Sequence, residues 1–463
     1  MTEEQHPFIE KFAFSVGEFS DTVAYQSFTY LIFTFYFSVI KLNVNWITLG
    51  FIIWSIWNAL NDPLMGLLSD RTRTKWGRRK PWILAATIPL SLVMFFLFTP
   101  LGYTDFGKFI YFLIIIMVFD GVYTMMSLNH TSLFPEMYID DKSRASVSSM
   151  RRYFTVVGLI VAFVIPTLFI EDLTNKSGLP YTINQYQING AVLGVIIFIG
   201  LIILLKWGIK EKKEFRDDAL NTPNIFKAFK YTLKNKSFLF YVVAGLMNWY
   251  VFGMLPTIIP FYGTYVLHIE KESILLSVLL LVAFLMSIPG IYIWKIIGFK
   301  IGTRQGLMLS MSTWAIAMIP FYFISNFISG LITMVFVGIG LAGSLYYIDL
   351  IISDIIDEDE LKTGVRREGG YYGINALIIR LSTILIFVTI GLVLNTTGWY
   401  VYDPGAYSLK IELGLRSLMF IFPDIALVIG IISLYFYPLH GNKLKEIRMA
   451  REKLHTEKRS KVK

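Results

Sequence analysis

The chain alternates between long apolar stretches and shorter polar ones. A helix needs about 20 mostly apolar residues to cross a bilayer. Twelve stretches meet this requirement: roughly 19–40, 46–68, 82–101, 108–131, 153–171, 188–208, 238–266, 273–297, 305–325, 327–351, 371–396 and 413–438. The pattern therefore predicts an all-α membrane protein with twelve transmembrane helices.

Positive charge is spread unevenly over the polar stretches. Residues 70–80 hold six Lys and Arg, residues 206–236 hold nine and residues 439–463 hold nine. These clusters follow even-numbered segments, whereas LPYTINQYQ, after the fifth segment, carries no positive charge. Because positively charged loops face the cytoplasm, we expect a multi-pass protein of the cell membrane with both termini cytoplasmic.

The longest polar interruption divides the chain into two halves. We predict an N-terminal six-helix bundle over 1–208, a cytoplasmic linker over 209–237, a C-terminal six-helix bundle over 238–438 and a basic cytoplasmic tail over 439–463. Many secondary transporters have this layout, with the substrate site between the halves. The linker can equally be a solvated loop with no regulatory role.

Composition agrees with a bilayer protein. Of the 463 residues, 55% are apolar and 16% are charged, against roughly a quarter charged in soluble proteins; the mean hydropathy is +0.58. The N-terminus, MTEEQHPFIEKF, lacks the basic start of a secretory signal, so we expect the first segment to be retained.

Several classes of function are disfavoured by the sequence. The chain has no cysteine, which excludes thiolate metal sites and cysteine nucleophiles. The patterns GxxxxGK[ST], HExxH and GxSxG do not occur, so we expect neither ATP-driven transport nor an enzyme. The basic clusters lie between apolar segments, which favours membrane topology over nucleic-acid binding.

Asp62 lies inside the second apolar segment. An ionised carboxylate at that depth costs about 3 kcal/mol on insertion scales, so it is a functional candidate. Helical spacing places Ser55 and Asn58 on the same face as Asp62, and all three offer oxygen atoms. Sodium needs several oxygen ligands, whereas a proton needs a single carboxylate. Both coupling ions therefore stay open.

Four motifs resemble one family. NDPLMGLLSDRTRTKWGRRKPWIL contains the loop signature of the major facilitator superfamily, G-x-x-x-D-R followed by basic residues. Together with GEFSD, YTMMSLNHTSLFPEM and DIIDEDELKTGVRREGGYYG, it resembles the glycoside–pentoside–hexuronide cation symporters, the melibiose-carrier family. The resemblance extends from about residue 17 to 380. It implies the major facilitator fold and cation-coupled symport of a sugar, glycoside or uronide by alternating access. No cofactor is expected besides the coupling ion, sodium or proton, and a monomer in the lipid bilayer is expected to suffice.

The resemblance also implies site residues. The cation-binding candidates are Asp62, Asn58, Thr124 and Asp21. The substrate-binding candidates are Thr22, Tyr25, Tyr123, Ser127, Thr131, Arg152 and Arg380. Melibiose carriers have sugar-binding acids at the positions of Thr22 and Ser127, a tryptophan at Thr131 and a second cation-site acid at Asn58. These departures disfavour α-galactosides as substrates and weaken the case for sodium.

The basic cluster after the second segment suggests a conformational latch. Its predicted members are Gly66, Asp70, Arg71, Arg78, Arg79 and Asp354. Small size at Gly66 is expected to allow close helix approach. The arginines can pair with carboxylates at helix ends, and Asp354, Asp357 and Glu360 are the predicted partners across the halves. The same charges can also serve only to set the topology.

Other interpretations stay open. Arg380 either contacts an anionic substrate or forms a fixed ion pair with Asp21 or Asp62, and His130 either serves the substrate or packs. Relatives of the family move lysophospholipids, so an amphipathic substrate is an alternative. A non-transporting membrane sensor is a second alternative, against which the short termini and the lack of an added soluble domain argue.

Overall fold

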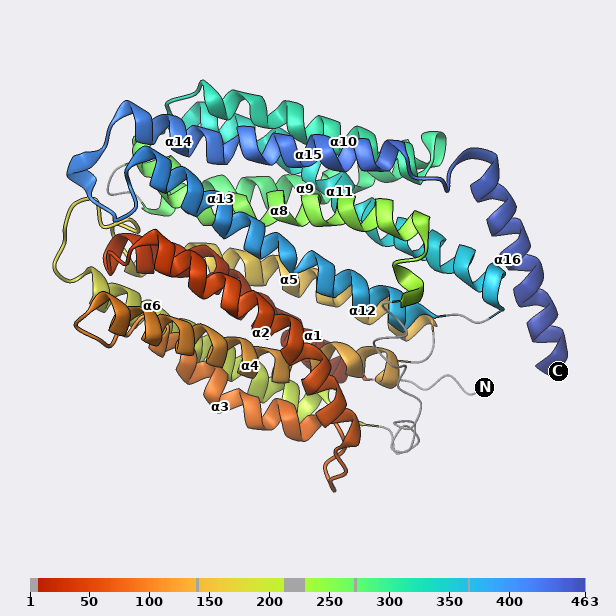
Figure 1. The fold of residues 1–463 in the computed structure, drawn as a ribbon. Coiled ribbons are helices and arrows are strands. Elements are labelled where there is room, and N and C mark those ends of the chain that lie inside the picture. Colours follow the sequence, from red (N-terminus) through yellow and green to blue (C-terminus); the bar gives the residue numbers. More distant parts are fainter. Residues whose placement is uncertain (1–6, 139–140, 212–229, 270–272, 365–366, 463) are drawn as a thin grey trace. The chain divides into compact units, whose positions relative to one another are not determined.

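The structure is a computed structural model that describes residues 7–138, 141–211, 230–269, 273–364 and 367–462. Within these ranges it consists of helices and their connections, with one isolated bridge between Thr74 and Gly77 and no β-strand (Figure 1). Eight of the described helices are long and apolar enough to cross a membrane, and Lys80–Phe96 is a shorter apolar helix. The expectation of an all-α membrane protein is confirmed.

A helix or a pair of consecutive helices overlaps most of each of the twelve predicted segments. The first six segments correspond to α1 (Phe8–Thr34) with the π-helical turn η1 (Phe35–Val39), α2 (Val44–Arg71), α3 (Lys80–Phe96), α4 (Asp105–Met137), α5 (Asp141–Phe169), and α6 (Thr182–Ile203) with η2 (Leu204–Gly208).

The last six correspond to α8 (Lys236–Tyr265), α9 (Ser273–Ile301), α10 (Thr303–Met318) with η5 (Ile319–Tyr322), α11 (Phe327–Thr363), α12 (Glu368–Ile379) with α13 (Leu381–Thr397), and α14 (Leu409–Met419) with α15 (Ile421–Tyr435). A short 3-10 turn, η6 (Pro404–Ala406), precedes α14, and α16 (Gly441–Val462) lies in the predicted tail.

Local side-chain chemistry sets several helix ends. The side chains of Asn43, Thr104 and Asn326 accept hydrogen bonds from backbone N–H groups in the first turns of α2, α4 and α11, respectively. Asn and Thr are preferred at this position because they satisfy N–H groups that the helix leaves without a partner. At its other end, α11 stops at Gly364, whose φ of +73° lies in the left-handed region that favours glycine.

The two last predicted segments are interrupted rather than continuous. Between α12 and α13 the helix tightens, because Thr383 N–H donates to the carbonyl of Arg380, three residues earlier. Between α14 and α15, Phe420 leaves the helical region with φ −128° and ψ −64°. The first interruption places Arg380, a predicted substrate residue, at a helix junction.

The chain forms two compact units. The first comprises Met1–Asn221, Ile259–Leu281 and Ile390–Gly414, and the second Thr222–Ile258, Val282–Thr389 and Leu415–Lys463. This division differs from the predicted bundle boundaries at 208 and 238, which stay a prediction. Most of the predicted linker, residues 212–229, lies outside the described residues.

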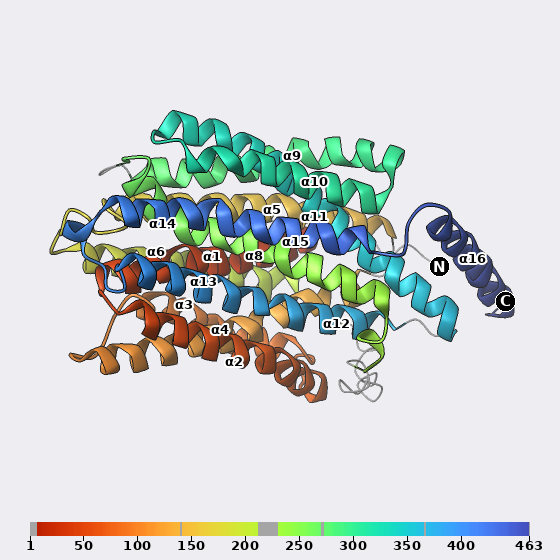
Figure 2. The same ribbon diagram turned by 45° about the horizontal axis from the view of Figure 1, so that its top comes forward.

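Helix pairs in the first unit pack through small residues. The unit packs α1 against α5, α2 against α4, and α3 against α6 (Figure 2). Gly190 and Gly194 of α6 face backbone carbonyls of α3, and Gly158 of α5 faces Thr22 of α1. Small residues at such positions let membrane helices approach closely, so these contacts hold the helices that carry the candidate site.

Pieces from late in the sequence complete the first unit. Asn45 of α2 and Asn395 of α13 exchange amide hydrogen bonds of 3.2 and 2.7 Å, and Val44 N–H donates to the Tyr400 carbonyl at 2.8 Å. Ser277 of α9 donates to the Phe163 carbonyl at 2.5 Å and lies 3.4 Å from the Tyr30 hydroxyl. The α2–α13 contact, defined by Asn45, Thr48, Gly391 and Asn395, thus joins distant parts of the chain.

Candidate transport site

Asp62 is linked to α4 by a hydrogen bond. Thr124 Oγ1 donates to Asp62 Oδ1 at 3.2 Å, and Thr124 is 4% exposed. One turn earlier on α2, Asn58 is 8% exposed. The structure therefore brings together Asp62 and Thr124, two predicted cation-binding residues from different helices. It also buries a third, Asn58, on α2.

Two further polar residues lie next to this link and were not predicted as site residues. Asn61 precedes Asp62, and its Nδ2 donates to Asp120 Oδ2 at 3.1 Å and to the Asp120 carbonyl at 3.2 Å. Their signal in the sequence was spacing, since Asp120 lies four residues before Thr124 and Asn61 lies three residues after Asn58. Helical geometry places residues three or four apart on one face.

Asp21 of α1 lies in a second polar cluster with α4. The hydroxyl groups of Ser127 and Tyr123 are hydrogen-bonding neighbours of the Asp21 carboxylate. Tyr123 also stacks on Tyr25, with ring centroids 5.3 Å apart and an interplanar angle of 28°. The Asp21 Oδ1 atom is buried with no hydrogen-bond partner among the described residues. The cluster thus offers an accepting carboxylate oxygen, hydroxyl groups and an aromatic face in one place.

An ion pair stands beside this cluster. Arg151 of α5 pairs with Glu18 of α1, with Nε 2.7 Å from Oε2, and its guanidinium lies 4.9 Å from the centroid of the Phe134 ring. Arg152, which was predicted to bind substrate, is exposed. The sequence pointed to Arg152 and missed Arg151. The helical register of α5 turns Arg151 toward Glu18 and leaves Arg152 exposed.

Other predicted residues have different surroundings. Thr22 is 7% exposed and faces Gly158, where an added Cβ would lie 2.8 Å from Thr22 Cβ. Thr131 is exposed, and Arg380 lies half-buried in the second unit. His130 is 1% exposed, its Nε2 lies 2.9 Å from the Phe14 carbonyl, and its ring packs on Phe14, which supports the packing role.

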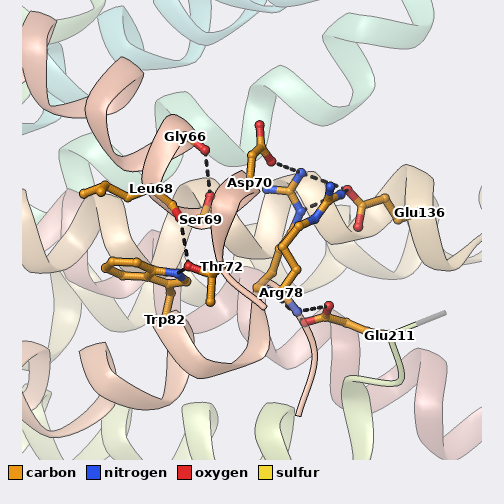
Figure 3. Close-up of polar contacts among 10 residues, drawn as sticks. Gly66, Leu68, Ser69, Asp70, Thr72, Arg78, Trp82, Glu136 and Glu211 are labelled. Atoms are coloured by element: carbon orange, nitrogen blue, oxygen red, sulfur yellow. Dashed lines mark hydrogen bonds and ion pairs between the residues drawn. The ribbon is translucent and has the colours of Figure 1, made fainter. Parts of the chain in front are cut away.

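The basic cluster after α2 forms a charge network within the first unit. Asp70 at the end of α2 pairs with Arg79 at 3.1 Å, and both Arg78 and Arg79 pair with Glu136 at the end of α4, at 2.7 and 2.8 Å. Figure 3 shows the carboxylates of Asp70 and Glu136 turned toward these guanidinium groups. Arg71 is exposed. The sequence identified the arginines but not Glu136, which follows Pro135 in α4.

Glu211 binds the start of α3 through its carboxylate. Its two oxygens accept backbone N–H bonds from Arg78 at 2.6 Å, Arg79 at 2.8 Å and Lys80 at 2.6 Å (Figure 3). Helix N-termini favour anions because their first N–H groups lack partners. Gly77, with φ +114°, leaves room for the carboxylate, because a Cβ there would overlap it. The first residues of the predicted linker are thus attached to α3.

Two predicted latch residues, Gly66 and Asp354, have other surroundings in the structure. A Cβ at Gly66 would lie 3.7 Å from Leu128, an ordinary contact, so no close helix approach depends on this glycine. Asp354 pairs with Arg448 at 2.9 Å and Asp357 with Arg451 at 2.7 Å. Both arginines come from α16, which lies with these acids in the second unit. The pairing of the acids with the arginines after α2 stays a prediction.

The acidic end of α11 has a further partner. Arg367 donates to both oxygens of Asp359, at 2.8 and 2.5 Å, and its guanidinium lies 3.9 Å from the centroid of the Tyr231 ring. The hydrogen bond to Asp359 raises the pKa of Arg367 above its ordinary value, so its charge is retained. Buried acids at this end are therefore held by fixed cations within the second unit.

Comparisons with known proteins agree with this architecture. The family model described as MFS/sugar transport protein matches residues 13–441. A symporter of Bacillus subtilis described as uncharacterized is 27% identical, and the match covers 95% of this chain and 93% of the relative. A putative sulfoquinovose importer of Salmonella typhimurium is 25% identical, with coverages of 94% and 90%. The sodium-dependent lysophosphatidylcholine symporter 1 of Gallus gallus is 21% identical, with coverages of 87% and 81%.

Solved structures support the same fold. The nucleoside transporter NupG superposes with a TM-score of 0.65 at 14% identity and covers 92% of this chain and 99% of its own. A D-xylose–proton symporter gives a TM-score of 0.64 at 13% identity, with coverages of 92% and 97%. The major facilitator fold is therefore established. The chain belongs to the MFS/sugar transport protein family, in keeping with its resemblance to the glycoside–pentoside–hexuronide symporters, and is a multi-pass membrane transporter rather than an enzyme.

Proposed function

We propose that this transporter couples the movement of a cation, sodium or proton, to symport of a sugar, glycoside or uronide by alternating access. The observation that carries the proposal is the Asp62 carboxylate inside α2, bound by Thr124 of α4. An ionised carboxylate within a membrane segment is costly, so a cation that neutralises it lowers the free energy of the loaded state. Binding can then favour one conformation over the other.

The Asp21 cluster supports a polyhydroxylated substrate. A carboxylate accepts hydrogen bonds from sugar hydroxyls, hydroxyl side chains can donate or accept them, and an aromatic face covers the apolar side of a sugar ring. Asp21, Tyr123 and Ser127 supply the polar groups, and the stacked Tyr25–Tyr123 pair supplies the ring. We place the substrate there, with Thr22, Thr131, Arg152 and Arg380 as further candidates from the family resemblance.

The charge network after α2 supports a latch. Asp70, Arg78 and Arg79 join the ends of α2, the α2–α3 loop and α4. We propose that this network stabilises one access state on the cytoplasmic side and rearranges in the other. Gly66 and Arg71, the other predicted latch residues of this region, take no part in its ion pairs. In this proposal both termini face the cytoplasm of the cell membrane, and a monomer is the functional unit.

A lysophospholipid is the alternative substrate. It is favoured by one relative, described as a sodium-dependent lysophosphatidylcholine symporter, whose match covers 87% of this chain. The Asp21 cluster argues for a neutral sugar or glycoside instead, because a carboxylate would repel a phosphate group, as it would the carboxylate of a uronide. The choice between a sugar and a lysophospholipid therefore depends on the charge of the Asp21 carboxylate next to the bound molecule.

A thermal-shift screen of the purified protein tests the proposal. Sugars, glycosides, uronides and lysophospholipids are each added with sodium, lithium or changed pH. A ligand that binds the native state raises the unfolding temperature. We expect stabilisation by one sugar class that strengthens with sodium or with proton concentration. Stabilisation by lysophospholipids alone, or sugar binding that no cation affects, would contradict the proposal.

A further inference from the structure

Positive charge and indole rings gather where α3 begins and α6 ends. The turn that joins α2 to α3 exposes Arg71, Lys75 and Trp76, and the Trp76 residue is 56% exposed. At the end of α6, η2 exposes Lys206 and Trp207, and Trp207 is 43% exposed. In both places a lysine lies over the neighbouring indole, with Nζ 5.2 and 4.4 Å from the ring centroid.

These two groups lie at the same end of the first unit. α3 packs along α6, and η2 contacts α3. Glu211, four residues after Trp207, accepts backbone N–H bonds at the start of α3, including one of 2.6 Å from Lys80. The exposed cations of the α2–α3 turn and of η2 are therefore neighbours in the fold, although about 130 residues separate them in the sequence.

Hydrogen bonds fix the shape of the α2–α3 turn. Trp76 N–H donates to Thr74 Oγ1 at 3.2 Å, and Thr74 Oγ1 donates to the Gly77 carbonyl at 2.8 Å. Trp82 Nε1 donates to Thr72 Oγ1 at 2.8 Å, which attaches the turn to α3 (Figure 3). A turn that is already ordered loses little conformational entropy when a ligand binds to it.

An exposed apolar row on each helix leads to these cations. The row on α3 has a residue at every fourth position and starts one turn after Lys80; it consists of Leu84, Ile88, Leu92 and Phe96. The row on α6 consists of Val195, Ile199 and Ile202, and Lys206 follows at the same helical spacing. Exposed apolar faces of this kind contact the acyl chains of a membrane. A ligand that matches both features has hydrocarbon chains and a negative headgroup.

The carboxylates nearest to the turn do not oppose a negative headgroup. Asp70 pairs with Arg79, and Glu136 pairs with Arg78 and Arg79. Both arginines are buried. The pairing turns these acids toward buried cations, and the side chains that the turn exposes at Arg71 and Lys75 are positive.

We propose that Arg71, Lys75, Trp76, Lys206 and Trp207 form a docking surface for an anionic phospholipid, whose acyl chains lie along α3 and α6. Lys and Arg near a membrane surface attract anionic headgroups, and tryptophan prefers the boundary between headgroups and chains. The bound lipid is neither the substrate nor the coupling ion, so this docking surface does not depend on the proposed function.

A lipid titration tests the docking surface. The purified full-length protein in dodecyl maltoside receives dioleoylphosphatidylglycerol or dioleoylphosphatidylcholine, and the unfolding temperature is followed. A lipid that binds the native state raises this temperature. We expect saturable stabilisation by phosphatidylglycerol and weaker stabilisation by phosphatidylcholine. The difference should shrink in high salt, because salt screens the attraction between exposed charges.

Lysine variants test the headgroup contact. Lys75→Gln combined with Lys206→Gln should raise the half-saturating phosphatidylglycerol concentration by about tenfold, because each lost charge weakens the attraction to the headgroup. Lys295→Gln combined with Lys300→Gln is the matched control. It removes two exposed lysines from α9 and should keep the wild-type value.

Tryptophan variants locate the lipid. Bromine quenches the fluorescence of a nearby indole, so phosphatidylglycerol with brominated acyl chains should quench the wild type more than brominated phosphatidylcholine does. Trp76→Phe combined with Trp207→Phe should remove most of this excess quenching. A purely structural role of the two rings would leave the excess in place.

Four results would overturn the inference. They are equal stabilisation by the two lipids, a wild-type half-saturating concentration in the Lys75 and Lys206 double variant, an equal loss in the α9 control, and excess quenching that survives in the tryptophan variant. Stabilisation by inorganic phosphate at the wild-type lipid level would also contradict a lipid ligand, since it would need no acyl chain. None of these results bears on Asp62, whose coupling role is tested by transport.

Discussion

Thr22 illustrates how a residue aligned with a family's binding position can acquire a different environment. The resemblance implies substrate binding, but the buried Thr22 side chain lies against Gly158 of α5. Helix packing is sensitive to this pair because an extra methyl group at position 158 has no space. The substrate role of Thr22 stays a prediction, while the packing role can be tested without knowing the substrate.

We expect Gly158→Ala to destabilise the protein by about 1–3 kcal/mol, the usual cost of overpacking. The added Cβ would lie 2.8 Å from Thr22 Cβ and 3.2 Å from the Phe19 carbonyl, so α1 and α5 would have to separate. Thermal unfolding in detergent measures the effect. Gly245→Ala, where an added Cβ meets nothing within 4 Å, is the control and should not lower the unfolding temperature. Equal stability of the two variants would contradict the packing role.

At the scale of elements, the start of α3 depends on a residue 131 positions away. Glu211 accepts three backbone N–H bonds at Arg78, Arg79 and Lys80. We expect Glu211→Gln to destabilise this end of the helix by about 1–3 kcal/mol, because charged acceptors make stronger hydrogen bonds than neutral ones. Gly77→Ala should have a similar effect by excluding the carboxylate and straining a positive φ.

Limited proteolysis and thermal unfolding of the full chain measure this change. We expect faster cleavage around Glu211 in both variants, since the residue that attaches the linker to α3 would be released. Glu446→Gln, an exposed acid on α16, is the matched control. Unchanged cleavage in Glu211→Gln would mean that the contact does not hold the linker in solution.

The α2–α13 contact offers a direct test of the conformational state. An added Cβ at Gly391 would lie 3.6 Å from Thr48 Cβ, within the usual Cβ separation of a disulfide of about 3.5–4.5 Å. The chain has no native cysteine, so Thr48→Cys with Gly391→Cys would form the only possible disulfide within one molecule. We expect this bridge to form readily and to block transport until it is reduced.

Mobility on non-reducing gels and uptake before and after dithiothreitol measure the outcome. Each single cysteine variant serves as its control and should transport with or without reductant. Full transport by the oxidised double variant would show that α2 and α13 need not separate during the cycle.

The helices were predictable because each rests on a local property, a run of about 20 apolar residues. Their interruptions at Arg380 and Phe420 were not, because apolar residues continue on both sides of each position. In the candidate site, spacing and family motifs identified Asp62 and Thr124. They did not identify Asn61 with Asp120, or Arg151 with Glu18, because the register between packed helices sets these pairs.

At the scale of the whole molecule, charge placement predicted the basic loops but not their partners. Asp354 and Asp357 are predicted to pair with the arginines after α2, and within the second unit they pair with Arg448 and Arg451 of α16, which the sequence did not indicate. An acid and a base far apart in sequence can pair in many combinations, and only the folded backbone selects one. The orientation of the termini stays a prediction from the distribution of Lys and Arg.

Asp62 is the residue that links cation flow to substrate movement in the proposed mechanism. The most direct measurement compares wild type and Asp62→Asn in proteoliposomes, using the sugar that the thermal-shift screen identifies. Uptake against a concentration gradient is driven by an inward sodium or proton gradient, and counterflow is measured without one. We predict that Asp62→Asn loses uphill accumulation and keeps counterflow, because alternating access persists without coupling. Uphill accumulation at the wild-type level in Asp62→Asn would contradict the central claim.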